Sequence, residues 1–124
     1  MNGVSEEIIV KSSSYFKKWL RKLKNPLAKA KINLRIKNLL LGNLGDVKPI
    51  GDGLSELRIH EGQGYRVYIK SRSSLNPKTK KMVCTIIILL CGGDKSTQDE
   101  DIARAKWMST SKEIKEFLNE NQYD

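Results

Sequence analysis

Apolar residues in the N-terminal third of the chain follow a helical period after one short strand. The run at 7–11 predicts an edge strand, and the serines at 12–14 favour a helix N-terminus. Asn25-Pro26 separates two predicted helices, because proline suits the first helical position. We therefore expect an antiparallel helical hairpin, ended by Gly42, with apolar stripes made of Phe16, Trp19, Leu20 and Leu23, and of Ala28, Ile32, Ile36, Leu39 and Leu40.

Alternating residues between positions 55 and 70 predict a β-hairpin whose polar side chains share one face. Burial of the other face sets the register: it places Leu57 opposite Val67 and leaves a three-residue loop at 61–63. The same register places Arg58 opposite Arg66. Two like charges directly across a ladder destabilise it unless an anion lies beside them. That anion is either Glu56 or a bound phosphate, so we expect the function to lie here.

The remaining pattern predicts a small α+β domain spanning residues 1–124. We expect a mainly antiparallel sheet, with the N-terminal strand and the helical hairpin packed on it and helix at the C-terminal end. The further segments are a loop at 42–54, a polar turn at 73–81, a central strand at 82–91 that is apolar on both faces, a helix from a capping box at 97–100 to about 108, and a short final helix carrying Ile114, Phe117 and Leu118.

Charge is distributed unevenly along the chain. The net charge is +9, and residues 8–45 carry ten Lys or Arg and no Asp or Glu. From residue 94 onward, the sequence contains eight acidic and five basic residues. The basic block would bind a polyanion or an acidic protein partner, or it would simply be a solvated, lysine-rich face. The residues of this block expected to contact a polyanion, which the family resemblance described below identifies with RNA, are Lys17, Lys18, Arg21, Lys22, Lys29 and Lys37.

No secretory signal is visible in the sequence, so we expect none, and the most apolar run is shorter than the ~20 residues of a membrane span. Cys84 and Cys91 would lie about 23 Å apart on one strand, beyond disulfide reach. They also lack partners at zinc-ligand spacing. These features predict a cytoplasmic protein with buried core thiols, no metal and no small-molecule cofactor.

Two further motifs carry possible chemistry. Gly92-Gly93-Asp94-Lys95 lacks the spacing of a nucleotide triphosphate site. It fits either a single-phosphate site at a helix N-terminus, with Lys95 adding charge, or a plain strand-to-helix turn. His60, the only histidine, is either a surface residue at a strand end or a catalytic one.

Several motifs together resemble one toxin family. The sequence is similar to the HigB-type branch of the RelE/ParE toxin superfamily, often called addiction-module killer proteins. The resemblance covers roughly residues 15–105 and rests on Gly42-Asn43-Leu44-Gly45-Asp46, Ser55-Glu56-Leu57-Arg58-Ile59, Gly64-Tyr65-Arg66-Val67-Tyr68, Gly92-Gly93-Asp94-Lys95-Ser96-Thr97-Gln98 and Asp101-Ile102.

The resemblance implies a RelE-like compact fold and the toxin of a type II toxin–antitoxin system. It implies a metal-independent endoribonuclease that cleaves mRNA on the ribosome, held inactive by a cognate antitoxin of helix-turn-helix type. Arg66 matches the arginine of the family's strand motif and is assigned to the scissile phosphate. Arg58 and Lys95 would share its charge, and Glu56 would be a base or an arginine-orienting residue. Tyr68 would stack on a base or position a phosphate, and Tyr65 would join the RNA-binding residues.

Two other functions remain open at this point. A ParE-like protein would inhibit DNA gyrase without enzymatic activity, and a non-toxic domain would only bind nucleic acid. The opposed arginines favour cleavage, because a binding surface has no need of opposed like charges. The residues do not identify the general acid, since Gly92-Gly93-Asp94-Lys95 stands where some relatives of the superfamily carry a histidine-tyrosine or arginine-tyrosine pair.

Overall fold

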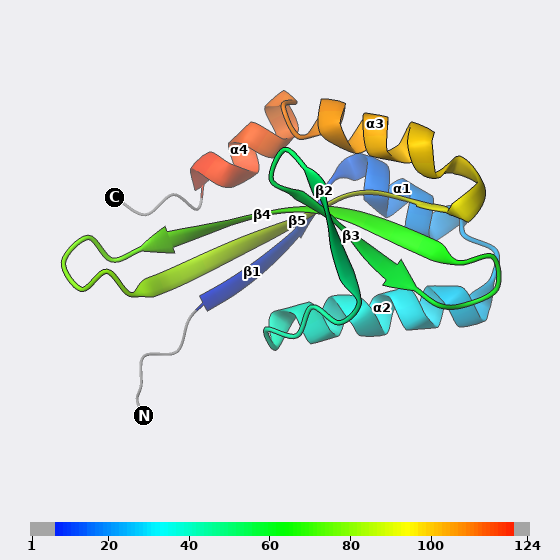
Figure 1. The fold of residues 1–124 in the computed structure, drawn as a ribbon, viewed down its shortest axis with the longest axis horizontal. Coiled ribbons are helices and arrows are strands. Elements are labelled where there is room, and N and C mark those ends of the chain that lie inside the picture. Colours follow the sequence, from blue (N-terminus) through cyan, green and yellow to red (C-terminus); the bar gives the residue numbers. More distant parts are fainter. Residues whose placement is uncertain (1–6, 121–124) are drawn as a thin grey trace.

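A computed structural model of the protein describes residues 7–120 and confirms the predicted α+β class (Figure 1). A five-stranded open sheet has the order β1-β5-β4-β3-β2. β1 runs parallel to β5, and the other neighbours are antiparallel. The elements are β1 (Glu7–Ser12), α1 (Ser14–Lys22), α2 (Pro26–Leu40), β2 (Val47–Gly51), β3 (Leu54–Ile59), β4 (Tyr65–Leu75), β5 (Met82–Asp94), the 3-10 turn η1 (Lys95–Thr97), α3 (Gln98–Met108) and α4 (Lys112–Glu120).

The helices form layers on both faces of the sheet. α2 lies along one face, and α3 and α4 cover the other (Figure 1). The core beneath α1 and α2 contains Phe16, Ala28, Ile32, Leu39, Leu57, Ile59, Tyr65, Val67, Ile69, Ile87 and Leu89. The core beneath α3 and α4 contains Leu54, Tyr68, Ile86, Ile88, Leu90, Cys91, Ala105, Met108, Ile114 and Leu118. β5 is therefore apolar on both faces, as predicted for a strand covered on each side.

The structure of the helical hairpin agrees with the sequence-based prediction except at one position. The Ser13 hydroxyl accepts a hydrogen bond from the Phe16 amide at 2.9 Å, and Asn25 caps α2. Gly42 follows α2 with a φ of 81°, which a glycine adopts without strain. Leu40 is 51% exposed, so its assignment to the buried stripe was wrong.

Four predicted segment boundaries were wrong. The strand predicted at 82–91 continues to Asp94 as β5. Residues 47–51, predicted as loop, form β2, whose position at the sheet edge tolerates Pro49 because no further strand needs its missing N–H. Residues 73–75, predicted as turn, extend β4, where the Ser73 and Thr85 hydroxyls are 2.9 Å apart. The β3–β4 pairing ends at Ile59 and Tyr65, so the hairpin loop has five residues, 60–64.

Neither the capping box predicted at 97–100 nor the similar Thr-x-x-Glu pattern at 110–113 forms the bonds of a capping box. Thr97 makes no capping bond, and its hydroxyl instead donates to the Asp101 carboxylate at 2.6 Å. The Ile114 amide donates to Ser111, and Glu113 accepts from the Ser14 amide at 3.1 Å. Both helices nevertheless occur close to the predicted positions, because their apolar faces complete the second core layer.

The two cysteines are buried and unpaired on β5, as predicted. Burial raises the pKa of the Cys91 thiol to about 12, and the nearby Asp101 charge acts in the same direction. The thiolate is the reactive form of cysteine. We therefore expect iodoacetamide at pH 8 to alkylate Cys91 at least about 100-fold more slowly in the native protein than in urea. Mass spectrometry over time measures this ratio. Rapid native labelling of both thiols would contradict the packing of β5.

Candidate active site

A row of charged residues crosses the sheet beneath the N-terminal end of α3. Arg58 on β3 pairs with Arg66 on β4, as the sequence predicts, and Arg66 pairs with Gly93 on β5. The Arg58 amide donates to the Asp46 carbonyl at 3.0 Å, which extends the row past the start of β2. Residues paired across antiparallel strands project to the same face. Arg58 and Arg66 therefore project to one surface, and Asp46 lies next to Arg58 through its backbone.

Glu56 is the anion that offsets the two opposed arginines. Its side chain is fully buried, and its Oε1 lies 3.2 Å from Arg58 Nε and 3.4 Å from Arg66 Nε. Its Oε2 accepts a hydrogen bond of 2.8 Å from the Gln98 side chain in the first turn of α3. The carboxylate thus holds two guanidinium groups at once, and α3 closes over it.

The surroundings of Glu56 keep its carboxyl group ionised. Burial by itself raises the pKa, but the hydrogen bonds from Gln98 and Arg58 and the charges of Arg66 and Arg58 outweigh it, so the pKa lies below its ordinary value. A buried carboxylate with a lowered pKa and both oxygens engaged is a poor proton acceptor. The arrangement argues against a base role for Glu56 and supports the alternative, arginine-orienting role.

The two arginines differ in their access to solvent. The Arg58 side chain is 34% exposed, whereas that of Arg66 is 11% exposed. Arg66 Nη1 donates to the Gly64 carbonyl at 3.2 Å. Arg66 Nη1 and Lys95 Cδ lie 3.8 and 4.0 Å from the position that a Cβ on Gly64 would occupy. The Lys95 side chain therefore lies near Arg66, with Gly64 next to both.

Tyr68 does not fit its predicted role. The side chain is completely buried under α3, and its hydroxyl has no hydrogen-bond partner among the residues described here. Burial is the main cause of its raised pKa, so the hydroxyl stays protonated. The expectation that Tyr68 stacks on a base or contacts a phosphate was wrong, because the polar face of the hairpin is covered by a helix at this position.

Asp46 and His60 extend the site on the side of Arg58 away from Arg66. His60 Nε2 lies 2.6 Å from Asp46 Oδ2. Arg35 of α2 positions this corner: its Nη2 donates to the carbonyls of Leu44 and Asp46 at 2.9 and 3.0 Å, and its Nη1 donates to the Arg58 carbonyl. The sequence pointed to His60 but not to its carboxylate partner.

Gly92 and Gly93 do not form the phosphate-binding turn that was one of the two interpretations of this motif. Both are buried residues of β5, paired with Val67 and Arg66 of β4. They are small because other side chains lie directly on them: a Cβ on Gly92 would be 2.4 Å from the Trp19 ring, and one on Gly93 would be 1.8 Å from Asp101 Oδ2. The acidic first turn of α3 also disfavours an anion there.

The predicted RNA-binding residues are mostly accessible on the helical hairpin. Five of them are exposed: Lys17, Lys18, Arg21, Lys22 and Lys37. Lys29 is half-buried and donates to the Arg21 carbonyl at 3.3 Å. Tyr65 is buried in the core beneath the helical hairpin, although it is among the residues that line a groove. The basic surface therefore belongs to the helices, and Tyr65 contributes little to it.

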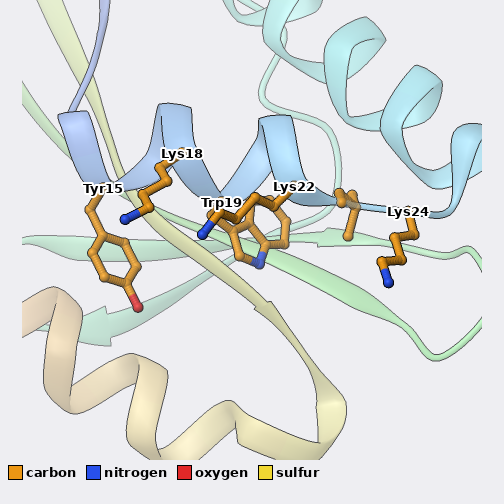
Figure 2. A pocket seen from close by; sticks show the side chains of 6 residues that line it. Tyr15, Lys18, Trp19, Lys22 and Lys24 are labelled. Carbon is orange, nitrogen blue, oxygen red and sulfur yellow. The ribbon is translucent and has the colours of Figure 1, made fainter.

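A groove follows the side of α1 that faces α3 (Figure 2). Its first part has a volume of about 500 Å³, and Lys18, Lys22 and Lys24 contribute basic side chains beside the Trp19 ring. A second part of about 590 Å³ shares Trp19 and Lys24 and continues to Gln63 and Asp94. The groove thus ends beside the hairpin loop, close to Gly64 and Lys95.

Two properties of the described residues bear on other functions. Within residues 7–120, no cluster of three or more His, Cys, Asp or Glu side chains is arranged to hold a metal ion. The helices in this part of the chain are also too short or too polar to cross a membrane.

Gln98, which orients Glu56, belongs in the sequence to a capping box and to one of the family motifs. Asp46, which contacts His60, belongs to another of these motifs. No periodic signal identifies either residue, because each reaches the site through tertiary packing. The charged row and its supporting residues are therefore properties of the fold.

Comparison with known proteins identifies one informative relative. No family model and no solved structure matches the chain. A Haemophilus influenzae protein described as "Uncharacterized protein" is 54% identical over 102 residues, which cover 82% of this chain and 93% of the relative. Identity at this level over nearly the full length implies a shared fold. The chain therefore belongs to the same protein family as this Haemophilus influenzae protein.

Proposed function

We propose that this protein is the toxin of a type II toxin–antitoxin system and cleaves mRNA on the ribosome without a metal ion. The observation that carries the proposal is the pair of adjacent arginines oriented by one buried carboxylate, with Lys95 beside them. The resemblance of the motifs to HigB-type toxins gives this cationic cluster its candidate substrate, an RNA phosphate. The α+β architecture, with its helical hairpin and mainly antiparallel sheet, is compatible with a RelE-like fold.

The charge balance of the cluster suits a reacting phosphate. Arg58 and Arg66 carry two positive charges, Glu56 cancels one, and Lys95 adds another, so a net positive charge remains. When the 2′-hydroxyl of RNA attacks the phosphate, negative charge builds up on the phosphoryl oxygens. Guanidinium groups held in fixed positions stabilise that charge without rearrangement. Arg58, the more exposed of the two arginines, is placed to meet the phosphate first.

The basic surface of α1 and α2 provides the proposed contact with ribosomal RNA. Lys17, Lys18, Arg21 and Lys22 are exposed and close in sequence. Binding of this kind releases counterions and weakens steeply with added salt. In this proposal the helical hairpin of α1 and α2 holds the protein on the ribosome while the charged row contacts mRNA. An antitoxin neutralises the protein by covering either of these two surfaces.

The arginines provide the principal test. We expect Arg66→Ala to abolish cleavage of ribosome-bound mRNA, because removal of one charge-stabilising donor typically costs about 100- to 1,000-fold in rate. Arg58→Ala and Lys95→Ala should each lower the cleavage rate by a smaller factor. The measurement is primer-extension mapping of mRNA cleavage in a cell-free translation mixture, with circular dichroism to verify folding. Lys78→Ala, in the turn at the far end of β4 and β5, is the matched charge control. Undiminished cleavage by folded Arg66→Ala protein would reject this site.

One observation keeps gyrase inhibition as a second candidate. Because Glu56 already offsets the opposed arginines, the pair is stable without a phosphate, so it does not by itself exclude a protein-binding surface. The two toxins are separated by measuring translation and gyrase-dependent supercoiling in parallel at matched protein concentrations. Inhibition of supercoiling with intact mRNA would favour the gyrase inhibitor. If neither process is affected, the protein is a nucleic-acid-binding module.

A further inference from the structure

His60 and Asp46 form a contact pair at the margin of the charged row. Their side chains meet through Nε2 and Oδ2 at 2.6 Å, and that of His60 is 77% exposed. The contact uses Nε2, so Nδ1 is the ring nitrogen left to take up a proton from a ligand. An exposed imidazole oriented by a carboxylate is the arrangement that proton transfer requires.

The pair lies beside Arg58, at the edge of the charged row. His60 directly follows Ile59, the last residue of β3, and its ring contacts Asp46. Asp46 is next to Arg58 across the sheet, through the backbone bond of 3.0 Å. The hydrogen bond from His60 is the largest influence on Asp46 and lowers its pKa, with smaller contributions from the charges of Arg58 and Arg35. Asp46 therefore remains a carboxylate that can hold the ring.

The order of groups across the sheet matches the geometry of RNA transesterification. The attacking 2′-oxygen and the leaving 5′-oxygen lie on opposite sides of the phosphorus, so the base and the acid must also lie on opposite sides. Here His60 lies beyond Arg58 at one end of the row, and Lys95 lies beside Arg66 at the other end. A phosphate on the arginines would be flanked by both.

We propose that His60, oriented by Asp46, is the general base that takes the proton from the 2′-hydroxyl of the RNA. This inference rests on the function proposed above and supplies a group that the buried Glu56 and Tyr68 cannot provide. The 2′-oxygen forms a bond to phosphorus, and the bond from phosphorus to the 5′-oxygen breaks. His60 Nδ1 gains the 2′ proton, and the 5′-oxygen receives a proton from the Lys95 ammonium. The products are a 2′,3′-cyclic phosphate and a free 5′-hydroxyl, and water restores both side chains.

The test is the single-turnover rate of mRNA cleavage on programmed ribosomes. His60→Ala should lower this rate about 100-fold, as expected for loss of a general base, with folding unchanged because the side chain is exposed. Added imidazole should restore a large part of the rate to His60→Ala and none to Arg66→Ala. Asp46→Asn should lower kcat with little change in KM, and Asp46→Glu should recover part of the loss.

The outcomes separate the inference from the proposed function. If wild-type protein cleaves and His60→Ala cleaves equally well, the base assignment is wrong and the proposed function stands. Loss of cleavage that imidazole does not restore in a folded His60→Ala protein also rejects the assignment. If wild-type protein cleaves no mRNA on ribosomes, the proposed function fails, and the assignment fails with it.

Discussion

Replacement of Glu56 by alanine is expected to lower the free energy of unfolding by about 3–5 kcal/mol, the usual cost of removing one partner from a buried charge cluster. The variant leaves Arg58 and Arg66 opposed with no anion between them. It also leaves the Gln98 amide beneath α3 without its acceptor. Urea unfolding monitored by circular dichroism measures the change.

The control for this variant is an acidic residue outside the core. Glu61 pairs with Lys31 at 2.7 Å at the surface, so Glu61→Ala should cost about 0–1 kcal/mol. Equal destabilisation by the two substitutions would mean that Glu56 does not organise the arginines. Such a result would also remove the main support for the proposed phosphate site.

The same cluster predicts a dependence of stability on pH. The pKa of Glu56 in the folded protein lies below its ordinary value of 4.5. Its contribution to stability is therefore complete above pH 4.5 and is lost as pH falls through the lower, folded pKa. Glu56→Gln, which does not titrate, should lack this part of the acid dependence. Urea midpoints measured between pH 3 and pH 7 compare the two proteins.

Gly92→Ala is the second substitution with a large expected effect, because its new methyl group would overlap the indole of Trp19. Ideal placement of the Cβ brings it within 2.4 to 2.6 Å of three ring atoms. The indole ring is rigid, so the Trp19 side chain must turn or α1 must shift to make room for the methyl group. We expect the free energy of unfolding to fall by about 1–3 kcal/mol or more, as measured by the shift of the urea midpoint.

A double-mutant cycle tests this explanation directly. Trp19→Leu removes the overlapping ring atoms, so Gly92→Ala should cost much less in that background than in the wild-type protein. Additive effects of the two substitutions would contradict the close contact. Displacement of α1 should also alter the groove in Figure 2, since Tyr15, Lys18 and Trp19 all line it.

The sequence predicted the β-hairpin well because its two determinants are local. Side chains alternate with a period of two, and one face must be buried, so a slip of one residue would expose Leu57 and Val67. The pairing of Arg58 with Arg66 follows from this alone. β2 was missed for the opposite reason. Proline and glycine at 49 and 51 are typical of loops, and only the free edge of β3 makes this segment a strand.

The expected chemistry of individual residues was less reliable. Glu56 and Tyr68 were placed on a polar, accessible face, but α3 covers that face and buries both. Gly92 and Gly93 resembled part of a phosphate loop, but their small size accommodates Trp19 and Asp101. In each case the deciding contact comes from an element distant in sequence, so no local pattern could reveal it.

The sequence by itself determined the α+β class, the helical hairpin, the register of the central hairpin and the basic character of residues 8–45. These features depend on periodicity, capping and charge, which are local properties of the chain. Only the tertiary structure decided which polar groups remain accessible. Packing of α3 over β3 and β4 made Glu56 a buried partner of two arginines and brought Gln98 to it. The turn before β2 placed Asp46 against His60. A site of this kind depends on long-range contacts, which a single sequence does not specify.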